Sequence, residues 1–368
     1  MPALRDSDLD DVLSSIASWR PFDPGGACGL FVGAIGFEER ASACFIDWCA
    51  ARKGRGGKAF LVEYPMNQAD NAAQESRLLL AADAAGIRVI RRNYTRLALF
   101  GQAQAFFAEE ARDASILLDL SGMASFVFYP LISAICDSAP GATLDVCYAE
   151  AARYFPGRSE WVEFTDKFKA LDLVDRARLF EQYCFQSKGV ESVFESPHFP
   201  GRNDTQPTSL VVVPNFSVER VHRMLSFAAD NYSVNREECE WIIGMPPDRG
   251  KNGWRCEALW ELFQQPPQKH DACTLDFKEI LVALQRIWRD LYVSRSLVIA
   301  TVGSKAQHLG TFLFLKMHPD VGLVLSEPKQ FTASTYSKGV GRKWRVSFGP
   351  VGALLKVLRD WHQIIFSW

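Results

Sequence analysis

Residues 114–136 read Ala114-Ser-Ile-Leu-Leu-Asp-Leu-Ser-Gly-Met-Ala-Ser-Phe-Val-Phe-Tyr-Pro-Leu-Ile-Ser-Ala-Ile-Cys136, and they indicate the architecture of the chain. The stretch is nearly uncharged and as long as a membrane span, but Asp119, Ser121 and Gly122 interrupt it after a short Ile-Leu-Leu run. Pro130 interrupts it a second time. A buried strand, a tight turn and a buried helix explain this pattern better than a lipid-facing helix does.

The same alternation of apolar strands and helices extends toward the N-terminus. Predicted strands span 29–35, 58–64, 87–90, 116–120 and 143–148, and predicted helices span 41–51, 71–85, 99–111 and 123–136. A short amphipathic helix and a Pro/Gly-rich linker precede them in residues 1–25. Strands that alternate with helices of this length predict a mainly parallel, Rossmann-like sheet covered on both faces.

A second block of the same kind follows a polar segment. Its predicted strands span 210–213, 241–243, 296–300 and 321–325, with a strand or loop at 272–277, and its predicted helices span 218–229, 253–264, 278–292 and 306–317. We therefore divide the chain into four parts. These are a helix and linker (1–25), a first Rossmann-like half (26–156), a helical connector and linker (157–207) and a second Rossmann-like half (208–368).

Landmarks in the two blocks match at a nearly constant offset of 177 to 183 residues. Phe37-Glu-Glu-Arg40 matches Phe216-Ser-Val-Glu-Arg220, Asp119-Leu-Ser-Gly122 matches Thr301-Val-Gly-Ser304, and Trp161 matches Trp344. We interpret this as an internal duplication whose halves are related by a pseudo-two-fold axis. Their ligand-binding edges would then meet in one shared groove. The alternative is that two Rossmann-like blocks of similar length share their order by chance.

The clearest candidate binding motif is Thr301-Val-Gly303-Ser304-Lys305-Ala-Gln307, which connects a β-branched strand to a helix. Gly303 lets the backbone approach a ligand, and Ser304 can cap the helix and donate a hydrogen bond. Lys305 opposes the dipole at a helix N-terminus, which favours a bound anion there. An ordinary turn is the other interpretation, and the Walker A spacing is absent.

The first half offers a corresponding set of candidate ligand contacts. Asp119, Ser121 and Gly122 follow the fourth strand, and Asp119 could accept from a ribose hydroxyl or simply cap a helix. Gly36, Glu39 and Arg40 follow the first strand, although the turn lacks the G-x-G-x-x-G fingerprint of dinucleotide-binding domains. An internal Glu–Arg pair is the alternative interpretation of the charged residues.

A glycine-rich basic loop near the C-terminus is a third candidate. It contains Tyr336, Lys338, Arg342 and Trp344, which combine aromatic stacking surfaces with cations. We interpret it as a lid over a phosphate-bearing ligand, with a solvated loop as the alternative. From residue 301 to 368 there are nine Lys/Arg against three Asp/Glu, which suits an anionic ligand held by the C-terminal half.

Composition limits the classes of function. A net charge of −2 excludes a uniformly basic coat for long nucleic acids. The nine cysteines include no C-x-x-C pair, and the six histidines show no metal-ligand spacing. From these features we expect a cytoplasmic protein with reduced thiols, no cofactor, no zinc or other metal site, and no membrane partner.

The segment Thr301-Val-Gly303-Ser304-Lys305 resembles the strand-to-helix motif of CARF domains, and the paired layout of residues 29–350 is similar to SAVED domains. This resemblance implies that Gly303, Ser304 and Lys305 contact the phosphate of a cyclic oligonucleotide. Asp119, Ser121 and Gly122 would form a degenerate mate, because Met123 stands where the second half has Lys305. It also implies a second-messenger role in bacterial anti-phage defence.

Two functions follow from these expectations. The first is a sensor that binds a nucleotide-type anionic ligand and signals to a separate effector protein, since the chain shows no effector segment. The second is a metal-independent phosphodiesterase, or ring nuclease, that acts on such nucleotides. Positioning and electrostatics would suffice for that cleavage, so the sequence leaves open whether the chain is an enzyme.

Overall fold

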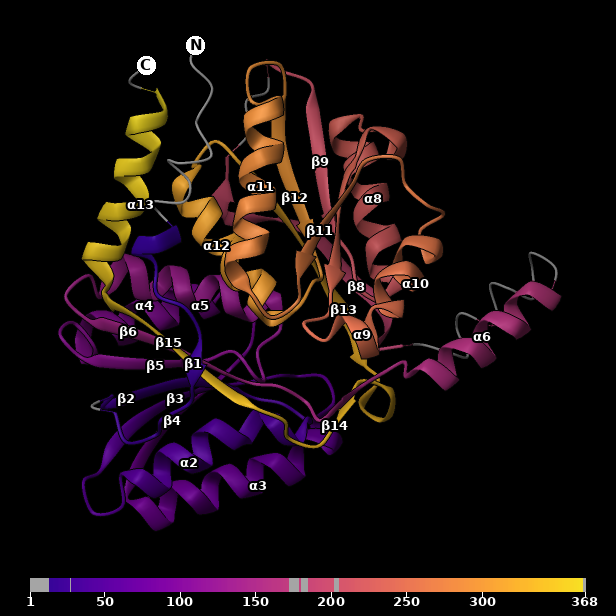
Figure 1. Cartoon of the computed structure of the whole chain (residues 1–368). Coiled ribbons are helices and arrows are strands. Elements are labelled where there is room, and N and C mark those ends of the chain that lie inside the picture. The colour runs from indigo at the N-terminus through magenta and orange to yellow at the C-terminus, as the bar shows by residue number, and fades with distance from the viewer. Residues whose placement is uncertain (1–12, 27, 172–178, 180–184, 202–204, 367–368) are drawn as a thin grey trace. The chain divides into compact units, whose positions relative to one another are not determined.

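The computed structural model describes residues 13–26, 28–171, 179, 185–201 and 205–366 (Figure 1). The chain splits into two compact units: unit 1 comprises residues 1–152 and 338–368, and unit 2 comprises residues 153–337. Each unit is built around a mainly parallel sheet with interspersed helices, which confirms the predicted α/β, Rossmann-like fold class. The predicted N-terminal helix lies largely outside the described residues.

Unit 1 contains a seven-stranded sheet in the order β1-β15-β6-β5-β2-β3-β4. The strands are β1 (Arg20–Pro21), β2 (Leu30–Ile35), β3 (Gly57–Glu63), β4 (Ile87–Asn93), β5 (Ser115–Asp119), β6 (Thr143–Ala149) and β15 (Lys343–Pro350). The helices are η1 (Glu39–Ser42), α2 (Ala43–Ala51), α3 (Gln68–Ala85), α4 (Leu99–Glu110), α5 (Ser125–Ser138) and α13 (Val351–Phe366). Strands β2 to β6 are parallel, whereas β15 runs antiparallel to β6.

Unit 2 contains a six-stranded sheet in the order β11-β10-β9-β12-β13-β8. The strands are β8 (Ser187–Pro200), β9 (Thr208–Val213), β10 (Glu240–Met245), β11 (Lys269–Cys273), β12 (Ser296–Thr301) and β13 (Gly322–Phe331). The helices are α6 (Arg158–Ala170), α8 (Val218–Tyr232), η2 (Arg236–Glu238), α9 (Arg249–Asn252), α10 (Trp254–Leu262), α11 (Phe277–Leu291), α12 (Lys305–Met317) and η3 (Ala333–Thr335). The short strands β7 (Arg153–Tyr154) and β14 (Ser337–Lys338) form a separate two-stranded sheet.

Both parallel cores have the same strand order. Numbered along each unit, the five parallel strands lie in the order 3-2-1-4-5. Strands 2 and 3 are added on one side of strand 1, and strands 4 and 5 are added on its other side, so the strand order reverses between neighbouring strands 1 and 4. In open α/β sheets, ligands bind at this reversal, beyond the carboxyl ends of the two strands. The corresponding strands are β2 and β5 in unit 1 and β9 and β12 in unit 2. The shared order agrees with a duplication, which itself stays a prediction.

Two antiparallel strands, β8 and β15, correct two sequence-based boundaries. Residues 187–200, predicted to belong to a linker, form β8, which pairs with β13; Pro197 and Pro200 are compatible with this edge position because an edge strand leaves half its N–H groups unpaired. Residues 343–350, assigned to the second half, form β15 and pair with β6 of unit 1. The second half therefore ends at Ser337. Trp344 lies in β15 and Trp161 in α6, so this pair is not a matching landmark.

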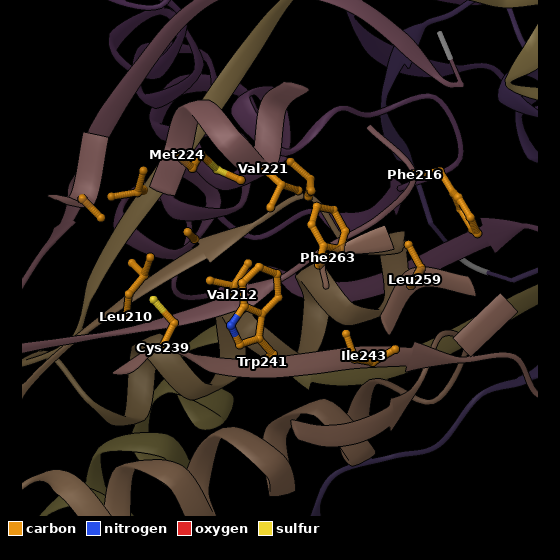
Figure 2. Close-up of a cluster of buried hydrophobic side chains, with 14 of the residues drawn as sticks. Leu210, Val212, Phe216, Val221, Met224, Cys239, Trp241, Ile243, Leu259 and Phe263 are labelled. Atoms are coloured by element: carbon orange, nitrogen blue, oxygen red, sulfur yellow. The ribbon is translucent and has the colours of Figure 1, made fainter. Parts of the chain in front are cut away.

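The core of unit 2 lies between its sheet and helices α8 and α10, where the side chains of Trp241 and Phe263 pack at a ring-centroid distance of 5.3 Å (Figure 2). Phe216, which follows β9, is also buried in this cluster and extends it toward the carboxyl edge of the sheet. Burial of these aromatic rings stabilises the unit and fixes the chain that follows β9. In unit 1 the corresponding layer contains Phe31, Phe45 and Trp48.

Residues 114–136 form the predicted strand, turn and helix. Strand β5 and helix α5 are almost wholly buried, and Pro130 lies inside α5 instead of ending it. Within the described parts of the chain, no helix is both long and apolar enough to cross a membrane.

Candidate functional site

In unit 1, a buried ion pair lies at the carboxyl edge of the sheet. Arg40, in η1, is 2% exposed, and its Nε and Nη2 donate to the two carboxylate oxygens of Glu38 at 2.8 and 3.1 Å. Its Nη1 donates to Tyr148 Oη at 2.9 Å and to Ala149 O at 3.3 Å, at the end of β6. The sequence marked Arg40 as a ligand contact, but the structure shows that Glu38 already neutralises it.

Asp119 and Ser121 form a buried hydrogen-bond network in unit 1. The Asp119 carboxylate accepts from the Ser121 N–H at 2.9 Å and from the Ser121 hydroxyl at 2.5 Å, and the Ser121 oxygen accepts from Ala149 N at 2.8 Å. Burial raises the pKa of Asp119 to about 6, against the opposing effect of these hydrogen bonds. Both side chains are buried, so they hold the β5 turn against β6 instead of presenting polar atoms to solvent.

Gly122 and Gly36, two of the candidate ligand contacts of unit 1, pack against protein atoms. A Cβ atom on Gly122 would lie 2.6 Å from Ala34 O, and one on Gly36 would lie 3.5 Å from Gly122 O. The Tyr64 hydroxyl accepts from Ala124 N at 2.7 Å and donates to Gly122 O at 3.0 Å, which satisfies a backbone group just before α5. The backbone around Gly122, which was predicted to contact a ligand, therefore contacts Ala34 and the Tyr64 hydroxyl.

The basic C-terminal loop is attached to unit 1. Glu39, which is exposed, accepts a hydrogen bond from Gly339 N at 3.1 Å, and Gly339 has a φ of +67° that favours glycine. Arg342 pairs with Glu150 at 3.2 Å, and the Trp344 indole donates to the same carboxylate at 2.7 Å. Lys338 is exposed at the start of this segment. Thus Lys338 and Arg342 belong to unit 1, whereas Tyr336 belongs to unit 2.

In unit 2 the motif after β12 forms a complete helix cap. The Ser304 hydroxyl accepts from Gln307 N at 3.1 Å and donates to Thr274 O at 2.5 Å, while Gln307 Oε1 accepts from Ser304 N at 2.8 Å. This capping box begins α12 as the sequence suggested for Ser304. Thr301 is fully buried, and a Cβ on Gly303 would lie 2.7 Å from Gln307 Oε1. Thr301, Gly303 and Gln307 therefore have structural roles.

Unit 2 contains a buried arginine, Arg220 in α8, whose partners differ from those of Arg40 in unit 1. It is 6% exposed, and its Nε and Nη2 donate to Ser326 Oγ at 3.0 Å and Ser326 O at 2.7 Å. In the described part of the chain, Nη1 has no hydrogen-bond acceptor and no carboxylate forms an ion pair with this guanidinium. Burial lowers the pKa of Arg220 to about 10, and the electrostatic interaction with Tyr336 opposes this effect.

Two further basic residues lie near Arg220. His308 is 5% exposed, and burial first, then the charges of Lys305 and Arg220, lower its pKa well below 6.5. Lys305 is half-buried in the first turn of α12. This edge of unit 2 thus combines a helix N-terminus, two cations and a neutral imidazole, an arrangement suited to an anion.

The two arginines hold matching positions in their sheets. Arg40 and Arg220 each follow the first parallel strand and each reach the fifth, where they donate to Ala149 O and Ser326 O respectively. Sequence reasoning aligned these residues but proposed only Arg40, and it missed His308. The sequence does contain the difference between the two arginines. Glu38 lies two residues before Arg40, whereas the apolar Val218 lies two residues before Arg220.

Comparisons with known proteins do not identify a family. No family model and no curated protein matches the chain. Among solved structures, one described as "AtPrR2 in apo form" is 11% identical, with a TM-score of 0.23, and the match covers 72% of this chain and 87% of that one. A putative sarcosine dimethylglycine methyltransferase from Galdieria sulphuraria is 12% identical, with a TM-score of 0.21 and coverage of 71% and 80%.

Proposed function

We propose that unit 2 binds a phosphate-bearing, nucleotide-type ligand at the carboxyl edge of its sheet, and that the chain is a sensor which signals to a separate effector protein. The observation that supports this is the buried guanidinium of Arg220 without a carboxylate partner among the described residues. The matching arginine of unit 1 has such a partner in Glu38.

The energetic argument starts from the cost of burying charge. Removing a charged group from water costs several kcal/mol unless an opposite charge or several hydrogen bonds compensate. Ser326 supplies two neutral acceptors to Arg220, and Nη1 is left for another group. A phosphate oxygen would supply both an acceptor and the opposite charge. Lys305 and the first turn of α12 add favourable potential for the same anion.

Binding measurements test the proposal. Isothermal titration of the full chain with inorganic phosphate, mononucleotides and cyclic oligonucleotides should find a ligand that Arg220→Gln weakens by about 1.5–3 kcal/mol, the contribution of one charge-assisted hydrogen bond. Lys305→Ala should have a similar effect, because it removes a cation from the same edge. Arg223→Gln and Lys188→Ala are matched controls, since both side chains are exposed on elements of unit 2.

The outcomes of this titration are distinct. Equal affinities of the wild type and Arg220→Gln for every bound ligand would exclude Arg220 from the site. Binding of no ligand in the panel would contradict the sensor role. Cyclic oligonucleotides are included because Thr301-Val-Gly303-Ser304-Lys305 resembles the CARF motif; tight binding of these compounds would support a second-messenger role in anti-phage defence.

A phosphodiesterase is the second candidate, and neutral His308 favours it. An imidazole whose pKa is held low by burial, and further by the charges of Lys305 and Arg220, is unprotonated at neutral pH and can accept a proton from an attacking hydroxyl. Analysis of the ligand after incubation separates the two functions: an intact ligand supports the sensor, and linear products that disappear in His308→Asn support the enzyme.

A cytoplasmic location is part of the proposal. The eight described cysteines are buried thiols and none of them is in a disulfide, as suits a reducing compartment.

A further inference from the structure

Unit 1 contains a buried cluster of metal-ligating side chains outside the proposed anion site. Cys44, Asp119 and Cys147 each offer one ligand atom, and these atoms all lie within 4.8 Å of one another. Cys44 and Cys147 are fully buried and Asp119 is 2% exposed. This is the one such group found in the part of the chain that the structure describes.

The fold brings the three residues together from distant parts of the sequence. Asp119 and Cys147 are register partners on the parallel strands β5 and β6, so their side chains lie next to each other on the same face of the sheet. Cys44 lies in the first turn of α2, which packs against that face. Side chains from β5, β6 and α2 thus lie next to one another.

The composition of the cluster favours a cation. One carboxylate and two thiols meet where almost nothing is exposed to solvent, and the two hydrogen bonds that Ser121 donates to this carboxylate both go to Asp119 Oδ1. The Arg40 guanidinium is already paired with Glu38. Buried anions are commonly stabilised by a paired cation or by metal coordination.

The geometry supplies three of the four ligands that a tetrahedral zinc ion takes. Three atoms no more than 4.8 Å apart all lie within about 2.8 Å of a common point. Zinc binds cysteine sulfur at about 2.3 Å and carboxylate oxygen at about 2.0–2.2 Å, so a contraction of roughly half an ångström completes three ligand bonds. Thiolate ligands select zinc or another thiophilic ion over calcium and magnesium.

We propose that Cys44, Asp119 and Cys147 bind a thiophilic divalent cation, namely zinc, which joins α2 to β5 and β6 and braces the carboxyl edge of unit 1. Binding converts two thiols to thiolates and releases their two protons to solvent, with no change of oxidation state. The sequence-based expectation of no zinc site rested on the absence of C-x-x-C spacing, which does not detect ligands from separate elements.

The test begins with the full-length wild-type protein. Elemental analysis of protein purified without chelator should find close to one zinc per chain. Replacement by Co²⁺ should give the ultraviolet charge-transfer absorption of thiolate–cobalt bonds. EDTA should remove the metal and lower the melting temperature. Because these measurements need no variant, they remain decisive even if substitutions in the core prevent folding.

Variants then assign the ligands. Cys44→Ala and Cys147→Ala should each lower zinc affinity at least tenfold and remove most of the cobalt absorption. Cys49→Ala is the control, because Cys49 is a buried thiol on the same helix α2 outside the cluster. Wild-type protein that binds neither metal after refolding with excess ion would overturn the proposal, as would equal zinc content in Cys44→Ala, Cys147→Ala and wild type. Anion titration of unit 2 is a separate measurement, so the two proposals can fail independently.

Discussion

Two buried arginines at matching positions differ in their partners: among the residues that the structure describes, Arg40 has a carboxylate partner and Arg220 has none. Glu38 makes a bidentate pair with Arg40, and both side chains are almost fully buried. Arg220 relies on Ser326. This single difference is the reason for assigning anion binding to unit 2, since a guanidinium that already holds a carboxylate has little affinity left for a phosphate.

The internal pair should be essential for the stability of unit 1. Glu38→Gln removes the charge but keeps the size of the side chain, and it should lower the free energy of unfolding by about 3–5 kcal/mol because the buried Arg40 guanidinium loses its bidentate carboxylate. Urea unfolding measures this change. Glu39→Gln is the control, since Glu39 is exposed and an amide oxygen can still accept from Gly339. A loss below about 1 kcal/mol for Glu38→Gln would show that Arg40 does not depend on this carboxylate.

His308 should make ligand-free protein sensitive to mild acid. Its pKa in the folded state lies below 6.5, so the unfolded chain takes up a proton first as pH falls. Stability is therefore fully present above about pH 6.5 and is lost as pH decreases below it, by at most about 1.4 kcal/mol per pH unit for this group. His308→Asn should flatten that part of the stability profile, measured by urea unfolding between pH 7.5 and 5. An unchanged slope would mean that His308 titrates normally.

At the scale of elements, the position of helix α12 depends on its contact with α11. Gly310 lies in α12, and a Cβ there would be 2.1 Å from Phe277 O and 2.3 Å from Ile280 Cγ2. The first of these atoms is backbone and cannot rotate away. The close approach of the two helices thus fixes where the N-terminus of α12, with Ser304 and Lys305, meets the carboxyl edge of the sheet.

Gly310→Ala should therefore destabilise the protein by about 2–3 kcal/mol through overpacking. Gly101→Ala is the matched control: Gly101 is exposed in α4, no atom lies within 4 Å of its Cβ position, and alanine should increase stability by about 0.5–1 kcal/mol there. Thermal unfolding measures both. Equal effects of the two substitutions would contradict the close helix contact.

The central parallel strands could be predicted from the sequence, and the antiparallel strands β8 and β15 could not. The central parallel strands are apolar runs because both of their faces are covered, as in Leu210–Val213. Strand β8 lies at a sheet edge, and β15 is covered on its far side only by the two-residue strand β1. Both carry prolines and charges, which such positions tolerate. The sequence-based division therefore placed residues 187–200 in a linker and residues 343–350 in the second Rossmann-like half.

The candidate site was only partly predictable for a similar reason. Ser304 was correctly expected to cap a helix, because an N-cap is a local pattern. Two features of the site depend on which distant residues the fold brings near. One is that no described carboxylate pairs with Arg220, and the other is that Cys44 lies beside Cys147. Thr301 and Gln307, chosen as ligand contacts, are buried and serve the turn.

At the scale of the whole molecule, the two units differ in continuity. Unit 2 is one uninterrupted segment, whereas unit 1 needs residues 338–368 to complete its sheet. Without β15, strand β6 loses its antiparallel neighbour and β1 loses its only strand partner among the described strands. Unit 1 also loses the ion pairs of Lys343 with Asp47 and of Arg345 with Asp145.

A fragment of residues 153–337 should fold cooperatively alone, because it contains its whole sheet and core. A fragment of residues 1–152 should show weak protection from amide hydrogen exchange in β5 and β6, because its sheet edge is open. Exchange measured by mass spectrometry tests both fragments. Strong protection throughout residues 1–152, or none in 153–337, would contradict this division.

A crystal structure of the full chain with the tightest ligand of the phosphate-bearing panel tests the assignment of the binding site most directly. A phosphate oxygen is predicted within hydrogen-bond distance of Arg220 Nη1 and close to the first turn of α12. A ligand bound at the carboxyl edge of unit 1, or one whose phosphate lies away from Arg220, would contradict the assignment.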